Sequence, residues 1–360
     1  MRVIHLVRST SWGGGERYAL DLCRYAAGQG HDVTAITRGV NTVDRNFREA
    51  SVPLLRMPLG GVLDFVTPLR LARLVSRMPE ERVVIHVHNF KDAELVARTK
   101  LLLGKSGGKI WLVCTRHLVK AGKCSRRWRG IYDAIDRLVF VSALTRREFL
   151  STAPPVDESR VRTVLNSIIV PEKYAVPRPL PGRQEVRLLF TGRLSPEKGV
   201  DVLIRAMAML GDMPLRLSVA GTGNPGYVNE LKRLARECGV EARIEWKGFL
   251  NDVFAEIVKA DICVAPSVWR EPFGLMLLEY MSQGRPAVTS SSGAQPEIMT
   301  DGIEGILVKS GDHAALAGAI GKLAEDAELR RRMGEEAYRT YSEKFAYEKF
   351  FDRIIDIYGE

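Results

Sequence analysis

Cysteine is scarce in this chain, and long apolar runs are missing. Only five of the 360 residues are cysteines, without C-x-x-C pairs or metal-site spacing: Cys23, Cys114, Cys124, Cys238 and Cys263. No apolar run reaches the length of a membrane span, and Met1 to Val7 lacks the charged start and cleavage site of an export signal. We therefore expect reduced thiols in a cytoplasmic protein that neither crosses a membrane nor is exported.

Acidic residues are few in the first half of the chain. Residues 1–180 hold 30 Lys and Arg against 16 Asp and Glu, whereas residues 181–360 hold 23 against 27. A solvated face is one explanation, but this imbalance favours an anionic partner, such as lipid headgroups or a phosphorylated acceptor. Nucleic acid is not expected, because no nucleic-acid-binding module is recognisable. The candidate acceptor- or membrane-binding residues are Lys120, Lys123, Arg126, Arg127, Trp128 and Arg129.

Short apolar runs alternate with helical patterns along the chain, which predicts parallel sheets covered by helices on both faces. Several prolines between 171 and 181 interrupt this pattern. We predict an α/β protein with two Rossmann-like, doubly wound domains facing a cleft. The predicted boundaries are 1–170 for the N-terminal domain, 171–185 for a proline-rich linker and 186–343 for the C-terminal domain. Residues 344–360 are expected to form a helix that docks back toward the N-terminal domain.

Open α/β sheets bind ligands beyond the carboxyl ends of their strands, so the loops there are the candidate sites. The first such loop contains Gly13, Gly14 and Gly15 before a helix, where backbone N–H groups suit a phosphate, although a tight structural turn is an equal alternative. A later loop, 190–199, places Arg193 and Lys198 five residues apart around Gly192 and Gly199. Arginine and lysine in one turn favour phosphate binding over surface charge.

Residues 221–226 spell G-x-G-x-x-G between a strand and a helix, with Glu245 about twenty residues further on. This pattern fits a dinucleotide fingerprint and makes an NAD-dependent oxidoreductase the main rival hypothesis. A glycine-rich loop that includes Gly221 and Gly223 serves the phosphates of a sugar nucleotide equally well.

The histidines give weaker signals. His117 ends a strand before the basic segment, where a catalytic and a structural role are about equally supported. His86 and His88 lie on one face of a strand but lack a third metal ligand, so we interpret them as structural. No D-x-D pair occurs, which removes the usual carboxylate clamp for a metal on a nucleotide diphosphate. We therefore predict no metal site.

Two glutamates in the segment 266–281 are the most informative residues. Glu271 precedes a predicted helix and Glu279 lies about two turns inside it. The start of that helix favours an anion such as a diphosphate. The two carboxylates can then accept hydrogen bonds from two polyols, and a sugar nucleotide contains both.

Taken in order, these motifs resemble the retaining glycosyltransferases of family 4, and the resemblance covers nearly the whole chain. It rests on 13–16, 30–33, 141–142, 190–199, 221–223, Gly248-Phe249, 266–267, 271–274, Glu279, 284–288 and 295–297. One departure is Asn166-Ser167-Ile168, where the family has Asn-Gly, and it bears on the turn into the linker.

The resemblance implies the GT-B fold, with acceptor binding in the N-terminal domain and donor binding in the C-terminal one. It assigns Arg193 and Lys198 to the donor diphosphate, Glu271 to the transferred sugar and His117 to the same sugar near its reacting carbon. The other donor-binding residues would be Gly14, Gly15, Gly192, Gly221, Gly223, Phe249, Phe273, Gly274, Leu275 and Glu279.

The expected reaction is metal-independent transfer from a UDP- or GDP-linked sugar with retained anomeric configuration, and no cofactor is expected. The basic segment suggests a lipid- or glycan-linked acceptor of envelope polysaccharide or lipopolysaccharide synthesis, at the inner face of a bacterial membrane. A non-catalytic GT-B binding protein is a further alternative.

Overall fold

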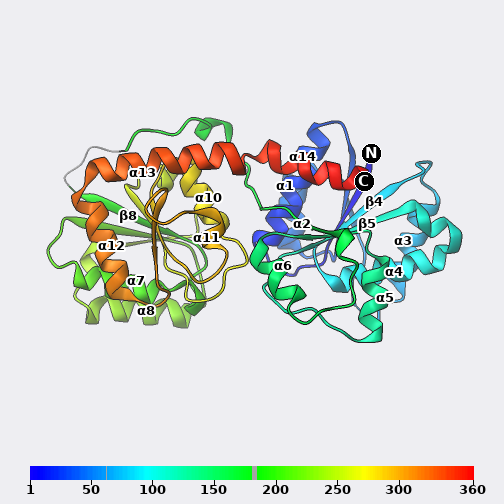
Figure 1. Cartoon of the computed structure of the whole chain (residues 1–360), viewed down its shortest axis with the longest axis horizontal. Helices are drawn as coiled ribbons and strands as arrows, with labels where there is room; N and C mark the ends of the chain where they lie inside the picture. The colour runs from blue at the N-terminus through cyan, green and yellow to red at the C-terminus, as the bar shows by residue number, and fades with distance from the viewer. Residues whose placement is uncertain (62, 181–184) are drawn as a thin grey trace. The chain divides into compact units, whose positions relative to one another are not determined.

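The computed structural model describes residues 1–61, 63–180 and 185–360, which form two compact units. The first unit comprises Met1–Asn166 and Tyr347–Glu360, and the second comprises Ser167–Ala346. Figure 1 traces the chain through both units by colour. Each unit is an open parallel sheet between helices, which confirms the predicted α/β class with two doubly wound sheets.

The sheet of the first unit has seven described strands in the order β3-β2-β1-β4-β5-β6-β7, all parallel. The chain therefore winds outward from β1 in one direction and then from β4 in the other, which creates a switch point between these two strands. The strands are β1 (Arg2–Val7), β2 (Asp32–Thr37), β3 (Leu54–Arg56), β4 (Val83–Val87), β5 (Ile110–Arg116), β6 (Arg137–Phe140) and β7 (Val161–Thr163).

Helices cover both faces of this sheet. On one face, α3, α4 and α5 bury the apolar side chains that β1, β4 and β5 direct toward them. On the other face, α1 and α14 pack together through the rings of Tyr18 and Phe350, whose centroids lie 5.5 Å apart. The helices are α1 (Gly14–Gly28), α2 (Asn41–Glu49), α3 (Val66–Ser76), α4 (Phe90–Leu103), α5 (Arg126–Ala134), α6 (Ala143–Leu150) and α14 (Tyr347–Gly359).

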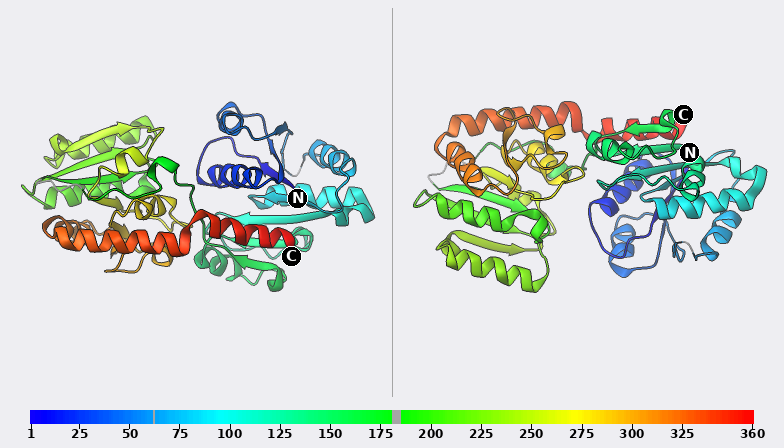
Figure 2. Two further views of the ribbon diagram at one scale, coloured as in Figure 1. Left: turned by 90° about the horizontal axis from the view of Figure 1, so that it is seen from above. Right: turned by 60° about the horizontal axis from the view of Figure 1, so that its bottom comes forward.

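The sheet of the second unit has six described strands in the order β10-β9-β8-β11-β12-β13, again all parallel. The strands are β8 (Val186–Thr191), β9 (Leu215–Ala220), β10 (Ile244–Gly248), β11 (Ile262–Ala265), β12 (Ala287–Ser290) and β13 (Gly305–Val308). The helices are α7 (Val200–Met209), α8 (Pro225–Glu237), α9 (Phe254–Ile257), α10 (Leu275–Ser282), α11 (Gln295–Ile298), α12 (His313–Glu325) and α13 (Ala327–Thr340). Figure 2 shows these strands between the helices of their own unit.

The predicted linker, 171–185, contains a short 3-10 helix, η3 (Glu172–Tyr174), and its residues 181–184 lie outside the described part of the chain. Tyr174 is buried and stacks on Phe254, so this part of the segment packs into the second unit. The helix α14 belongs to the first unit, where Trp111 Nε1 donates to the Ile357 carbonyl at 3.0 Å. Within the described residues, no helix is long and apolar enough to span a bilayer.

Candidate functional site

The turn after β8 contains a glycine that no other residue would replace easily. Gly199 has a φ of 68°, and a Cβ there would lie 2.0 Å from the Pro266 carbonyl oxygen. This contact brings the β8 turn against the loop after β11, and Val268 N donates to the Glu197 carbonyl at 2.9 Å across the same seam. The turn thereby places Lys198 beside the β11 loop.

Lys198 and Glu271 form an ion pair at the carboxyl ends of β8 and β11. The Lys198 side chain is 18% exposed and that of Glu271 is 7% exposed. Ser267 Oγ also donates to Glu271 Oε1, at 2.9 Å. Two donors hold one carboxylate oxygen in a largely dry position, so the carboxylate is oriented before any ligand arrives.

The backbone of Glu271 is fixed as well. Ala294 N donates to the Glu271 carbonyl at 3.0 Å, and a Cβ on Gly293 would lie 2.4 Å from Glu271 N. Sequence reasoning missed Ser267 and Gly293 as parts of the site. Ser267 lies in a motif that the resemblance includes, but the role of Gly293 depends on a contact between the loops after β11 and β12.

The glycine loop after β9 lies against the β8 turn. A Cβ on Gly221 would be 1.8 Å from the Gly192 carbonyl oxygen, and one on Gly223 would be 1.9 Å from the Leu194 carbonyl oxygen. Leu194 N also donates to the Thr222 carbonyl at 2.8 Å. The same loop borders a pocket of about 340 Å³ that Lys232 and Trp246 also line.

The rest of the dinucleotide pattern does not have the expected geometry. The third glycine of such a fingerprint normally permits close packing of the helix on the strand. Here Gly226 is exposed, and a Cβ would meet only the Oδ1 of Asn224, at 3.1 Å, which is a side-chain atom and not the backbone of a strand. Glu245 is exposed and pairs with Lys247 at 2.6 Å. The first two glycines therefore serve loop packing, and these observations do not favour the oxidoreductase hypothesis.

The helix α10 begins directly after the Glu271 loop. Gly274, with a φ of 124°, precedes its first residue, Leu275, and Glu279 lies further along the helix at 7% exposure. Phe273 is buried against Phe345, with ring centroids 6.3 Å apart, so its backbone and not its ring is the part that can meet a ligand.

Two predicted donor residues of the second unit lie in the open. Arg193 is exposed and makes no hydrogen bond or ion pair with the described residues. Phe249, directly after β10, is 70% exposed. The second unit therefore brings Lys198, Glu271 and the glycine loop together, while these two side chains remain accessible beside them.

In the first unit, the predicted residues Gly14, Gly15 and His117 lie near one another. Gly14 and Gly15 start α1, and the ideal Cβ position of Gly15 is 4.0 Å from His117 Cδ2. The His117 ring packs edge-on against Tyr18, with centroids 4.7 Å apart. Burial, with Arg116 nearby, lowers the pKa of His117 to about 4, so the imidazole is neutral at pH 7.

His117 is one of four clustered histidines. The group is completed by His5 from β1, His86 from β4 and His88 directly after β4, and His5 Nδ1 lies 3.3 Å from His88 Nε2. His86 bridges the Tyr358 hydroxyl at 2.6 Å and Thr115 Oγ1 at 2.7 Å. The described residues include no set of three or more His, Cys, Asp or Glu side chains arranged to hold a metal. The spacing of His86 and His88 did not indicate that His5 lies beside them, because that contact crosses between strands.

The basic segment is less uniformly exposed than its sequence suggests. Arg127 makes a bidentate contact with Glu94 on α4, at 2.7 and 2.8 Å. Trp128 packs against Phe90 and Tyr132, and the Lys123 ammonium lies 4.8 Å from its ring centroid. Trp128 is thus partly a core residue. The five basic residues of the segment, Lys120, Lys123, Arg126, Arg127 and Arg129, are all exposed.

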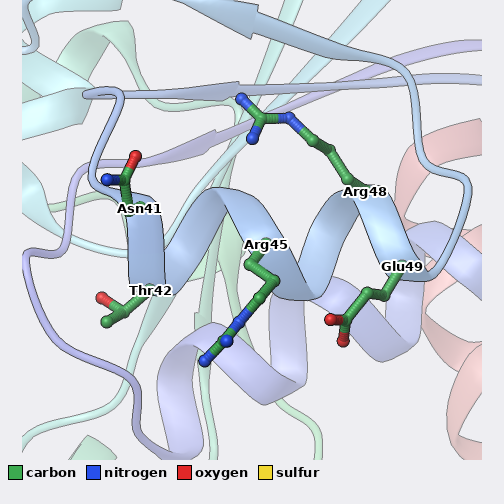
Figure 3. Close-up of a pocket in the computed structure, with 5 residues that line it drawn as sticks. All are labelled: Asn41, Thr42, Arg45, Arg48 and Glu49. Carbon is green, nitrogen blue, oxygen red and sulfur yellow. The ribbon is translucent and has the colours of Figure 1, made fainter.

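A second surface depression, about 450 Å³, lies along α2 and contains none of the predicted residues (Figure 3). Arg45 and Arg48 point to different sides of the helix in Figure 3, so the polar groups do not converge as they do in a ligand site.

Sequence and structure comparisons point to one class of protein. Residues 12–170 match the family described as Glycosyltransferase Family 4, and residues 178–340 match the family described as Glycosyl transferases group 1. The putative glycosyltransferase EpsD of Bacillus subtilis (strain 168) is 34% identical over 306 residues, covering 84% of this chain and 74% of that protein. The lipopolysaccharide core biosynthesis glycosyltransferase LpsE of Rhizobium meliloti (strain 1021) is 31% identical over 170 residues, covering 47% of this chain and 48% of that protein.

Among solved structures, that of Anabaena Alr3699/HepE in complex with UDP and glucose is similar with a TM-score of 0.81. The alignment covers 99% of this chain and 98% of that one, at 18% sequence identity. At this identity the likeness concerns the fold, and it confirms the predicted GT-B architecture.

Proposed function

Because this chain belongs to the glycosyltransferases of the GT-B fold, we propose that it transfers a sugar from a nucleotide diphosphate sugar with retained anomeric configuration. The observation that carries this proposal is the preorganised pair Lys198–Glu271 at the carboxyl ends of β8 and β11. The UDP and glucose named in the Anabaena structure support a nucleotide sugar as the donor class.

Different residues of the second unit would bind different parts of the donor. Lys198 and the accessible Arg193 would meet the diphosphate, together with the backbone N–H groups of Gly274 and Leu275 at the start of α10. Glu271 would accept hydrogen bonds from hydroxyls of the transferred sugar, and Glu279 from the ribose. Gly221 and Gly223 let the loop after β9 pack directly on the backbone of the β8 turn at Gly192 and Leu194, the turn that would meet the phosphates.

The chemical step is a substitution at the anomeric carbon. The acceptor hydroxyl oxygen forms a bond to the anomeric carbon while the bond between this carbon and the phosphate oxygen breaks. The departing phosphate accepts the proton of the acceptor hydroxyl. Negative charge grows on the diphosphate, so cations fixed at that position stabilise the transition state more than the ground state. Lys198, Arg193 and the start of α10 would supply this stabilisation, so the proposed mechanism needs no metal ion. Glu271 would position the sugar in the second unit, and the neutral His117 is the candidate sugar contact of the first unit.

We also propose that the acceptor is carried by a lipid or an envelope glycan and that the protein works at the inner face of the cytoplasmic membrane. Exposed apolar side chains on the outer surface of α3 and α4 support this placement: Phe65 is 66% exposed, Leu69 48% and Leu101 80%. The Arg98 guanidinium stacks on Phe65, at 4.7 Å from the ring centroid. Apolar side chains among arginines suit an anionic membrane surface, and the lipopolysaccharide core relative supports an envelope acceptor.

A panel of nucleotide sugars tests the activity directly. We expect slow hydrolysis of one UDP- or GDP-linked sugar by the purified protein, faster turnover when a suitable acceptor is added, and a raised melting temperature with the matching nucleoside diphosphate. Stabilisation by NAD but not by UDP or GDP would instead support the oxidoreductase. Nucleotide binding without any turnover across the panel would support a non-catalytic binding protein.

A further inference from the structure

A buried arginine without a counter-charge lies at the carboxyl edge of the first sheet. Arg116 is the last residue of β5 and is 9% exposed. Its side chain makes no hydrogen bond or ion pair with any residue that the structure describes, and the buried Nε has no hydrogen-bond partner. The guanidinium carbon lies 4.9 Å from the centroid of the Phe90 ring. Arginine stays charged when buried, so this cation costs free energy unless an anion binds it.

The groups around Arg116 do not supply that anion. Burial lowers the pKa of the guanidinium, and Cys114 and Tyr132 act in the opposite direction. Both of these are neutral at pH 7, because burial raises the pKa of the Cys114 thiol to about 12 and that of the Tyr132 phenol above its usual value. The carboxyl group of Asp92, on α4, lies 3.6 Å from Arg8 and forms an ion pair with it. Arg116 therefore keeps an uncompensated charge.

Arg8 adds a second cation on the same edge. It follows β1, which is two strands from β5 in the order β1-β4-β5, or about 10 Å away. Leu6 and Cys114, two residues before Arg8 and Arg116, both lie in the core under α3 and α4, so the two arginines leave the sheet on the same face. Arg8 Nη2 donates to the Leu59 carbonyl at 2.8 Å, but its buried Nη1 has no hydrogen-bond partner among the described residues.

The charge on Asp92 only partly balances Arg8. Burial raises the pKa of this carboxyl to about 7, although Arg8, Asn89 and Arg38 act to lower it. At neutral pH a fraction of the molecules therefore carries a protonated Asp92. Arg8, Arg116 and Asp92 together therefore carry a net positive charge, at the edge where an open α/β sheet binds its ligands.

We propose that Arg116, on the same edge of the sheet as Arg8, binds a phosphate group of the acceptor substrate. The inference rests on the proposed function, because it assigns this edge to the acceptor of a glycosyltransferase. A guanidinium can bind two phosphate oxygens at once. The phosphate belongs either to a lipid-linked diphosphate or to a soluble sugar phosphate, which offer the same chemistry to these two side chains.

The test uses pyrophosphate as the probe, on the full chain with its donor site saturated by UDP or GDP. We expect pyrophosphate to raise the melting temperature further, and Arg116→Met to weaken its apparent Kd about 10-fold or more. Arg116→Lys should retain part of the affinity, because it keeps a point charge. Arg146→Gln is the matched control, since Arg146 is an arginine of the same unit whose side chain is 40% exposed, 3.8 Å from Glu158, and this variant should bind as the wild type does.

The ligand-free melting temperature separates a binding role from a structural one. Arg116→Met removes an unpaired buried charge while keeping an apolar side chain over Phe90, so we expect it to melt no lower than the wild type. Equal pyrophosphate affinity in the wild type and Arg116→Met would overturn the proposal, as would a wild-type protein that pyrophosphate does not stabilise.

Two further measurements distinguish the two possible sources of the phosphate group and test the anion site independently of the proposed function. Tighter binding of farnesyl diphosphate than of pyrophosphate would support a lipid-linked acceptor, and equal binding a soluble one. If neither UDP nor GDP stabilises the wild type, the proposed function fails. Pyrophosphate titration of wild type and Arg116→Met without nucleotide then decides the anion site by itself.

Discussion

At the residue scale, the ion pair of Lys198 and Glu271 has a proposed role in turnover and a role in stability, and variants can separate the two. We expect Lys198→Met and Glu271→Gln each to lower kcat/KM at least about 100-fold, because each removes a group that we propose to bind the donor. Lys198→Met should also lower the free energy of unfolding by about 1–3 kcal/mol, since it leaves the largely buried Glu271 carboxylate without its partner.

The double variant Lys198→Met/Glu271→Gln is the control for this pair. It removes both charges, so stability should recover in part while activity stays lost, as measured by urea denaturation and donor turnover. Near-normal turnover in either single variant would contradict the assignment of the site.

The four clustered histidines predict a pH dependence of stability. Burial lowers the pKa of His5 to about 3 and that of His117 to about 4, and it lowers those of His86 and His88 as well. Below pH ~6.5 the unfolded chain takes up protons that the folded cluster does not. Their contribution to stability is therefore fully present above pH ~6.5 and is lost as the pH falls toward 4.

Each histidine that stays neutral should lower the free energy of unfolding by about 2 kcal/mol between pH 7 and pH 5. Urea midpoints across this range measure the slope, and His5→Asn should make it shallower. His313→Asn is the control, because His313 is exposed in the second unit and should leave the slope unchanged. A slope in His5→Asn equal to that of the wild type would contradict a neutral buried cluster.

At the scale of elements, the loops after β8 and β9 depend on glycines whose neighbours are backbone atoms. We expect Gly223→Ala to lower stability by about 2 kcal/mol or more, because its Cβ would collide with the Leu194 carbonyl oxygen. Gly226→Ala should be neutral or raise stability by up to about 1 kcal/mol, since Gly226 lies in the first turn of α8. Thermal denaturation compares the two. An equal loss of stability in both variants would instead support the close packing of helix on strand that a dinucleotide fingerprint requires.

Sequence patterns located these elements but not all of their contacts. The apolar runs and glycine motifs are local, and they predicted the strands, the turns after β8 and β9, and the two glutamates. Gly226 belongs to the same motif as Gly223, and only the distance between neighbouring backbones distinguishes them. Trp128 likewise lies within a basic run, but its ring contacts with Phe90 make it part of the core.

At the scale of the whole molecule, the excess of basic residues in the first half predicts salt-sensitive binding to anionic membranes. We expect cosedimentation with vesicles that increases with their content of anionic lipid and falls as salt is added. Leu101→Ser should weaken binding about 10-fold, because Leu101 is 80% exposed on α4. Val176→Ser, at a residue 78% exposed in the second unit, is the matched control. Vesicle binding that does not depend on anionic lipid would contradict a membrane role for this surface.

The sequence by itself determined the two doubly wound sheets and the resemblance to family 4, because hydrophobic periodicity and turn glycines act over a few residues. The tertiary structure decided which charges have partners. Lys198 and Glu271 are 73 positions apart and form a pair, whereas Arg116 is buried beside neutral groups with no counter-charge among the described residues. Pairing of this kind depends on which strand ends come together and on how much water remains between them, and neither can be read from spacing along the chain.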